Sequence, residues 1–277
     1  MQEIYGINLF TSATSIITNK VSQAATEWQN RPLDSLYMIV WMDGIVFKVR
    51  ENGKVINKTV YLCVGLNKEG LKEVLGMWIG KNESAAFWMG VLTDLKARGV
   101  EDILITVTDN LNGFTETIKS VFPASTTQIC VVHQIRNSCR HVVWKEKKEF
   151  TADLSNIYNA PTKEAAEMEL DNFEQKWGAK YPYAIRSWRN NWEELTVFFD
   201  FPVEIRKIIY TTNLIENLNG KIRKYTKNKL SFPNDDALKK SVYLAINEIE
   251  KKWYQPIWNW ALIFNQFITI FENRIQV

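Results

Sequence analysis

The sequence has few of the features that mark several large protein classes. Its 3 cysteines, Cys63, Cys130 and Cys139, show no paired spacing among 277 residues. This excludes a disulfide framework and suits a reducing, cytosolic setting. The most apolar stretch runs from Trp258 to Phe271, and polar residues at 259, 265, 266 and 269 interrupt it. We therefore expect a buried helix there rather than a membrane span.

The sequence also lacks a strong charge imbalance. With 34 Lys and Arg against 31 Asp and Glu, the net charge of +3 is too small to diagnose nucleic-acid binding. A hydrophobic content of 46% and a charged content of 23% are those of an ordinary globular protein. The length allows one large core or two smaller domains. No internal repeat or low-complexity tract is present, so function must be sought in local motifs.

Three acidic residues stand in unusual settings. Asp43 lies in the apolar run 36–43, and Asp109 ends a second apolar run, 103–109. Glu216 precedes the segment 221–229, in which five of nine residues are Lys or Arg. Acids are depleted in strands, and burying an unpaired charge is costly. The pattern therefore indicates a divalent-metal site beside a polyanion.

The order of predicted elements indicates the fold. Strands over 36–50, 55–66 and 73–79 are joined by turns at 51–54 and 67–70, and Asn52-Gly53 favours a tight hairpin. A helix over 84–98, a strand over 102–109, a helix over 114–121 and a strand over 127–132 follow. This order predicts an α/β fold: a ribonuclease H-like mixed sheet flanked by helices. In that topology the first and fourth strands are parallel neighbours, which would place Asp43 beside Asp109.

Four segments are predicted along the chain. Residues 1–34 form a helical region. Within it, 3–21 resembles the later part of a helix-turn-helix, with a turn at Gly6 and a short helix over 11–21; the alternative is a plain packing helix. Residues 35–135 form the first part of the core. An all-α insertion, 136–204, follows, and one of its apolar stripes comprises Ala166, Leu170, Phe173 and Trp177. Residues 205–277 complete the core with the helix that carries Glu216.

The helix around Glu216 is expected to have two faces. Leu214, Leu218, Ile222 and Tyr225 would dock on the sheet. The other face would present Asn213, Glu216, Gly220, Arg223 and Lys227, and the cations would contact phosphates with strong salt dependence. Converging carboxylates bind Mg²⁺ or Mn²⁺, and paired ions support in-line phosphoryl transfer.

Structural alternatives exist for each residue. Asp109 is a possible N-cap of the following helix, Glu216 a possible capping-box partner of Asn213, and Asp43 a possible ion-pair partner of a Lys or Arg. His133 is a candidate for DNA phosphate contact, for positioning beside the metals, or for core packing. The candidate zinc ligands are Cys130, His133, Cys139 and His141. A zinc site is disfavoured, because their spacing matches no common zinc module.

Six motifs together resemble the mutator-type, MULE-like transposases of bacterial insertion sequences: 43–50, 76–80, 109–114, 130–137, 210–219 and 231–236. The resemblance implies that Asp43, Asp109 and Glu216 are the catalytic DDE triad and the ligands of Mg²⁺ (or Mn²⁺). It implies that Cys130 and His133 are the family's C-x₂-H pair. The implied activity is metal-dependent DNA cleavage at element ends, followed by strand transfer into target DNA.

The resemblance also implies partners. The first partner is double-stranded DNA, both as the terminal inverted repeats of the element and as the target. The second is a further copy of the chain, because a homo-oligomer is expected to assemble on DNA. No membrane partner is expected, and the expected location is cytoplasmic and nucleoid-associated. Met1 would fall inside the last part of the repeat-binding region, so the chain is expected to be N-terminally shortened. A nuclease without strand transfer and an inactive DNA-binding remnant are the alternatives. The expected DNA contacts are His133, Arg136, Asn213, Asn219, Lys221, Arg223, Lys224 and Lys227.

Overall fold

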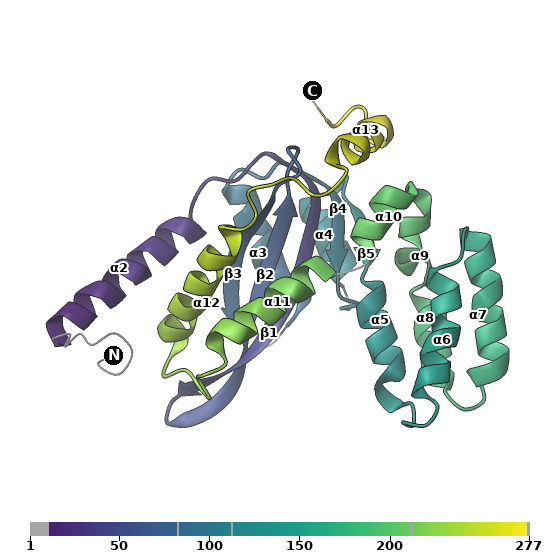
Figure 1. The fold of residues 1–277 in the computed structure, drawn as a ribbon, viewed down its shortest axis with the longest axis horizontal. Helices are drawn as coiled ribbons and strands as arrows, with labels where there is room; N and C mark the ends of the chain where they lie inside the picture. The colour runs from purple at the N-terminus through teal and green to yellow at the C-terminus, as the bar shows by residue number, and fades with distance from the viewer. Residues whose placement is uncertain (1–10, 82, 112, 211–212, 276–277) are drawn as a thin grey trace.

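The protein folds around a sheet of mixed strand direction (Figure 1). The computed structural model describes residues 11–81, 83–111, 113–210 and 213–275. The strands are β1 (Leu36–Glu51), β2 (Lys54–Leu66), β3 (Lys72–Gly80), β4 (Asp102–Thr108) and β5 (Thr126–Ile129). Their order is β3-β2-β1-β4-β5, with β1 antiparallel to β2 and parallel to β4. This is the predicted ribonuclease H-like arrangement.

The first hairpin forms as the sequence indicated. Asn52 and Gly53 adopt φ angles of +50° and +75°, which a tight hairpin turn requires. The turn fixes the register of β1 on β2, in which Asp43 lies opposite Leu62. Because side chains alternate along a strand, this register decides which face of the sheet each residue of β1 meets.

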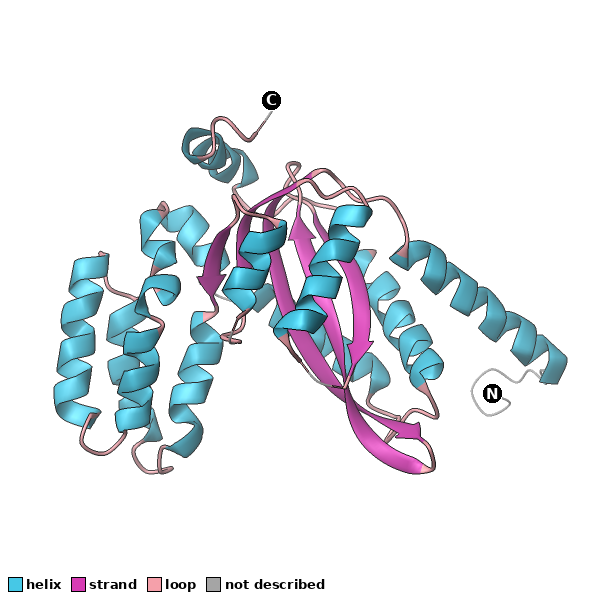
Figure 2. Cartoon of the chain, turned by 180° about the vertical axis from the view of Figure 1, so that it is seen from behind, coloured by secondary structure: helices cyan, strands magenta, loops and turns pink. Residues whose placement is uncertain are grey.

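Helices cover both faces of the sheet (Figure 2). On one face lie α3 (Ala85–Ala97) and α4 (Phe114–Val121), whose Trp88 and Phe114 rings stack at 4.7 Å between centroids. On the other face lie α11 (Asn213–Thr226) and α12 (Asp235–Glu250), as Figure 1 shows. The sheet is therefore buried on both sides, which explains the long apolar runs of β1 and β4.

The fifth strand is shorter than predicted. It ends at Ile129, and α5 (Val131–Ser138) begins where the sequence pattern indicated continued strand. Cys130 is the N-cap of α5, because its thiol accepts a hydrogen bond from the backbone N–H of His133. The apolar residues Val131 and Val132 were therefore misread as strand. His133 and Arg136 lie one helical turn apart as a consequence.

A helical bundle lies beyond the β5 edge of the sheet (Figure 1). The predicted stripe residues Ala166 and Trp177 are buried there, and so are Trp188 and Leu195. The bundle and the sheet share one continuous apolar cluster. The predicted boundaries at residues 136 and 204 remain predictions. The helices are α6 (Lys147–Tyr158), α7 (Lys163–Trp177), α8 (Pro182–Asn190), α9 (Trp192–Leu195) and α10 (Val203–Ile209).

The two ends of the chain add helices outside this core. Helix α2 (Thr11–Gln29) is longer than the predicted segment 11–21, and its Trp28 ring packs 5.7 Å from Tyr243. The predicted turn at residue 6 lies outside the described residues. In α13 (Trp260–Ile270), Ile263 and Phe267 are buried whereas other apolar residues are exposed, so the expectation of a buried helix is met in part. None of the described helices combines the length and apolar character needed to cross a bilayer.

Phe232 joins the segment after α11 to the sheet. Its backbone N–H donates to the carbonyl of Lys48 and its carbonyl accepts from the N–H of Arg50, each at 2.8 Å. Its ring, which is 2% exposed, packs edge-on against Phe47. We expect Phe232→Ala to lower the free energy of unfolding by about 3–5 kcal/mol, because the truncation leaves a cavity. Urea denaturation measures this, with the exposed Leu230→Ala as control.

Candidate metal and DNA site

Strand pairing brings Asp43 and Asp109 together. The parallel register of β1 and β4 pairs Trp41 with Val107. Asp43 and Asp109 each lie two residues further along the chain than these paired residues. Because side chains two residues apart share a face, both acids follow the face on which Trp41 and Val107 are buried. That face is the one covered by α11. The proximity predicted from the topology is therefore observed.

Asp43 is a buried carboxylate without a Lys or Arg partner among the described residues. It is 9% exposed. Its Oδ1 accepts from the backbone N–H of Gly44 at 2.7 Å, and its Oδ2 accepts from Asn219 Nδ2 at 2.6 Å. Burial raises the pKa of Asp43 to about 6, and the nearby charges of Asp109 and Glu216 raise it further against the lowering effect of His133. The described residues therefore give no support to the ion-pair alternative for Asp43.

Asp109 and Glu216 each contact a side chain of α5. Asp109 Oδ1 is in ion-pair contact with His133 Nδ1, without the angular geometry of a hydrogen bond. Glu216 Oε1 lies 2.8 Å from Arg136 Nη1. Burial by itself lowers the pKa of His133, but the close contacts with the Asp109 carboxylate and with Cys130 outweigh it and raise that pKa to about 11. Two acids of the predicted triad thus each face a cationic side chain of α5.

The structure tests the helix-capping role considered for Asp109 but not the one considered for Glu216. Gly113, with a φ of +77°, occupies the N-cap position of α4, so Asp109 does not cap that helix. Asn213 begins α11, but its side chain lies outside what the structure describes, and its predicted capping and DNA contacts remain untested. Glu216 lies in the first turn of α11, where the helix dipole favours a negative charge.

Helix α11 presents a different buried stripe from the one predicted. Leu218 and Ile222 are buried as expected, but Tyr225 is 56% exposed and Leu214 is half-buried. Ile215 and Thr226 fill the buried positions instead. Because a helix advances about 100° per residue, this rotates the docked face by a fraction of a turn. The rotation directs Asn219 toward Asp43, where it donates its hydrogen bond.

The residues at this site fit a hard divalent cation. Three carboxylates from β1, the end of β4 and α11 supply the oxygen donors that Mg²⁺ and Mn²⁺ prefer. Asn219 Oδ1 is a further oxygen, buried and without a hydrogen-bond partner among the described residues. Mutual repulsion of the carboxylates is visible in the raised pKa of Asp43. A bound cation would relieve that repulsion.

The disfavoured zinc set does not assemble among the described residues. A group that could hold a metal contains Asp109, Cys130 and His133, whose ligand atoms lie within 4.8 Å of one another. Cys139 is not part of this group, and the ring of His141 packs against Tyr183 at 5.3 Å. His133 therefore lies beside Asp109. This location agrees with the alternative in which His133 is positioned beside the metal-binding acids, and its role there remains a prediction.

One acid at the site was not singled out from the sequence. Glu83 precedes α3 and accepts a hydrogen bond from Trp88 Nε1 at 2.9 Å. Burial raises the pKa of Glu83, and the charge of Asp109 adds to the effect. Its position in a loop without an apolar run left no signal in the sequence.

Comparison with known proteins identifies the class. The chain is 43% identical over 275 residues to the probable transposase for insertion sequence element ISRM3-like of Sinorhizobium fredii (strain NBRC 101917 / NGR234), covering 99% of this chain and 69% of that relative. Identity and coverage are the same for the ISRM3 transposase of Rhizobium meliloti (strain 1021). The IS905 transposase of Lactococcus lactis is 30% identical over 257 residues, which are 93% of this chain and 65% of that one.

These relatives define the protein as a transposase of the insertion-sequence class. The model for the Mutator family of transposases matches residues 1–256, and the chain belongs to that family. A simian T-cell lymphotropic virus intasome in complex with PP2A regulatory subunit B56 gamma overlaps 53% of this chain and 50% of its own chain. At a TM-score of 0.26 and 15% identity, that likeness supports no conclusion.

Proposed function

We propose that this Mutator-family transposase cuts DNA at element ends and joins the freed 3′-hydroxyl to target DNA, with Asp43, Asp109 and Glu216 as its catalytic acids. The observation that supports this most is the buried, electrostatically strained Asp43 beside two further carboxylates. Three acids far apart in the sequence gather at one end of α11, where a hydrogen bond from α11 and ion pairs with α5 hold them.

The three acids would hold Mg²⁺ or Mn²⁺, which supplies nucleophile activation and charge stabilisation in phosphoryl transfer. Asp43 is oriented by two hydrogen bonds, from Gly44 and Asn219, so its carboxylate is preorganised. A Cβ at Gly44 would lie 2.6 Å from the Thr59 side chain, so this position of β1 accepts no larger residue without a shift. The backbone next to the first acid is therefore tightly defined.

The cations of α5 have two roles in this proposal. In the absence of metal, His133 and Arg136 neutralise Asp109 and Glu216. Once released from the acids, they face the position of the substrate phosphate, and Arg136, which is 57% exposed, is able to make a bidentate contact there. Their predicted DNA contacts thus follow from the same arrangement. Arg223 lies about two turns after Glu216 on the same flank of α11 and would extend this contact.

We expect Arg136→Ala to raise the Mn²⁺ affinity of the DNA-free protein by up to about fivefold. An exposed ion pair contributes about 0.2–1 kcal/mol, and a metal ion must displace Arg136 from Glu216. Calorimetric titration of Mn²⁺ measures the change, with the exposed Arg140→Ala as the matched control. An affinity equal to or below that of the wild type would show that Arg136 does not compete for Glu216.

The decisive experiment is a joining assay. A duplex carrying a pre-cleaved end of the encoding element is incubated with plasmid and Mn²⁺, and joined products are scored. Joined product supports the transposase proposal. Hydrolysis of an intact end without joining would favour the nuclease, and DNA binding without metal binding at millimolar Mn²⁺ would favour the inactive remnant.

A further inference from the structure

Helix α11 carries cations on two opposite flanks. Its buried stripe includes Ile215, Leu218 and Ile222, which faces the sheet. Glu216 and Asn219 lie on the flank that meets Asp43 and α5. At about 100° per residue, Lys221 and Tyr225 fall on the other side of the buried stripe, toward α12. The basic segment after Glu216 is therefore divided between two separate surfaces.

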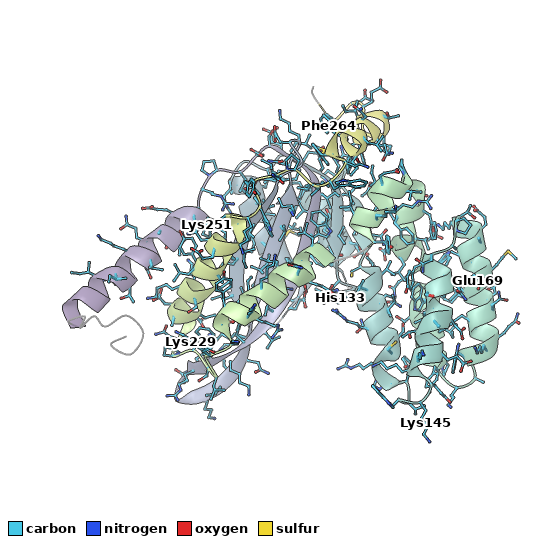
Figure 3. All side chains as sticks on the ribbon, viewed as in Figure 1. His133, Lys145, Glu169, Lys229, Lys251 and Phe264 are labelled. Carbon is cyan, nitrogen blue, oxygen red and sulfur yellow. The ribbon has the colours of Figure 1, made fainter. Side chains whose placement is uncertain are left out.

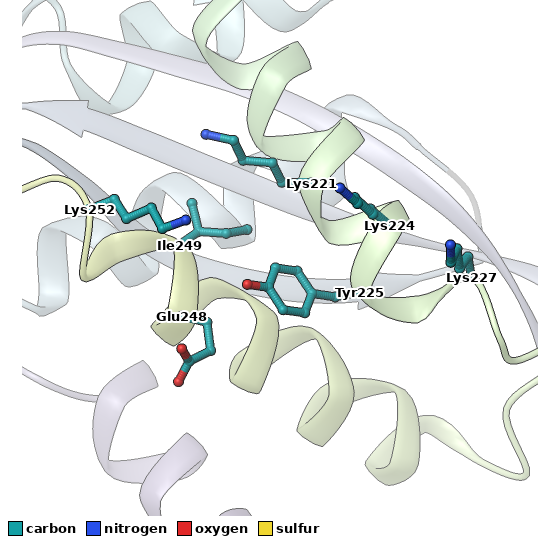
Figure 4. A pocket seen from close by; sticks show the side chains of 7 residues that line it. All are labelled: Lys221, Lys224, Tyr225, Lys227, Glu248, Ile249 and Lys252. Atoms are coloured by element: carbon teal, nitrogen blue, oxygen red, sulfur yellow. The ribbon is translucent and has the colours of Figure 1, made fainter.

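The second surface is a groove between α11 and the end of α12 (Figure 4). Its volume is about 480 Å³. Figure 4 shows Tyr225 reaching from α11 toward α12, while the carboxylate of Glu248 is directed away from the lysines. Glu248 is paired with Lys251, outside the groove. The lining residues are Lys221, Lys224, Tyr225, Lys227, Glu248, Ile249 and Lys252.

The lysines of this groove have no acidic partners among the residues that the structure describes. Across the described part of the chain, no ion pair involves Lys221, Lys224, Lys227 or Lys252. Elsewhere the surface cations are commonly paired, as Lys176 is with both Glu149 and Asp153. Figure 3 shows the described side chains as sticks on the ribbon. Lys72, whose ammonium lies 5.4 Å from the Trp253 ring centroid, adds charge nearby. Burial lowers the pKa of Lys72, and the charge of Lys221 lowers it further. Uncompensated positive charge of this density favours a polyanion.

The chemistry of the lining also indicates how a polyanion would be read. Lysine contacts phosphate as a point charge, whereas Arg, Asn and Gln read base edges through paired hydrogen bonds. The groove is lined by lysines, one tyrosine, one isoleucine and the outward-turned Glu248, and its described lining contains no Arg, Asn or Gln. The opposite flank of α11 carries Asn219 and faces Arg136. Sequence-independent contact therefore belongs to the groove, and end-specific contact to the flank beside the acids.

We infer that the α11–α12 groove binds the phosphate backbone of the target duplex, whose sequence need not be read. This inference rests on the proposed function, because a target duplex exists only if the protein joins DNA. It divides the predicted DNA contacts into two groups: Lys221, Lys224 and Lys227 act on target DNA, and Arg136, Asn219 and Arg223 act beside the cleaved end.

The test compares two triple variants of equal charge change. K221Q/K224Q/K252Q removes three groove lysines, and K20Q/K68Q/K119Q removes three lysines from other surfaces. Fluorescence anisotropy over a salt series measures binding to a random-sequence duplex and to a duplex carrying the element end. Melting curves confirm that both variants are folded. The joining assay is repeated over a range of plasmid concentrations.

We expect the groove variant to lose at least about tenfold in affinity for the random duplex. The slope of log affinity against log salt should become shallower by about 0.9 for each phosphate contact removed. The plasmid concentration giving half-maximal joining should rise, and binding of the element end should fall less. The control variant should follow the wild type in each measurement.

Three results would overturn the inference. Unchanged affinity and salt slope in the groove variant would show that the lysines do not touch DNA. Equal losses for the random duplex and the element end would show that the groove does not select the target. If the wild type binds DNA and cleaves ends but joins nothing, the strand-transfer part of the proposed function fails, and the target assignment fails with it while the salt slopes still report the groove contact.

Discussion

Asp43→Asn is expected to reduce strand transfer and end cleavage by about a thousandfold or more. A metal-held transition state is stabilised by several kcal/mol, and each 1.36 kcal/mol is about tenfold in rate. The substitution removes the charge while retaining the shape of the side chain. Single-turnover joining of a pre-cleaved end in Mn²⁺ measures the loss.

The fold should survive this change. The oxygen of the introduced amide can accept from the N–H of Gly44, as Asp43 Oδ1 does. Its nitrogen can donate to Asn219 Oδ1, which has no hydrogen-bond partner among the described residues, once the Asn219 amide turns over. The exposed Asp200→Asn is the matched control and should leave the rate unchanged. Wild-type joining by Asp43→Asn would remove Asp43 from the mechanism.

The metal-free protein should become less stable as pH rises from about 4 to about 6. Asp43 has a folded-state pKa of about 6 against an ordinary value of 3.8, so the folded state holds a proton that the unfolded chain has released. The contribution of Asp43 to stability therefore falls with pH across that interval. A shift of about two pKa units at about 1.36 kcal/mol per unit amounts to about 3 kcal/mol.

Urea denaturation with chelator at several pH values measures this effect. Asp43→Asn should remove the part of this fall that Asp43 contributes, and it should be the more stable protein at pH 7. Millimolar Mn²⁺ should reverse the order at pH 7, because the metal binds the folded wild type and not the unfolded chain. A wild-type stability that rises between pH 4 and 6, as for acids with lowered pKa values, would contradict the buried setting of Asp43.

Much of the fold and site follows from local patterns in the sequence. The Asn52-Gly53 turn, the alternation of strands and helices and the stripe from Ala166 to Trp177 are local signals, and each appears in the structure. The position of Asp43 beside Asp109 follows from strand order, because a parallel pairing of β1 with β4 is a property of the whole topology. The acids themselves are conspicuous, since charged residues seldom end or interrupt apolar runs.

Other features depend on contacts that sequence patterns do not encode. The end of β5 at Ile129 depends on the Cys130 cap, and apolar Val131 suits a strand and a buried helix equally. The rotation of α11 that exposes Tyr225 and buries Thr226 depends on how the helix packs against β1 and α12, which hydrophobicity along the chain does not encode. Glu83 joins the site through a loop without periodicity.

By itself, then, the sequence determined which residues are the candidates for the chemistry and in what order the strands and helices follow, because periodicity and misplaced charge are local properties of a chain. The tertiary structure decided which cation meets which acid, with Arg136 at Glu216 and His133 at Asp109. It also decided that the lysines after Glu216 line a groove apart from the acids. Both depend on how helices rotate and pack, which is settled by contacts between segments far apart in the chain.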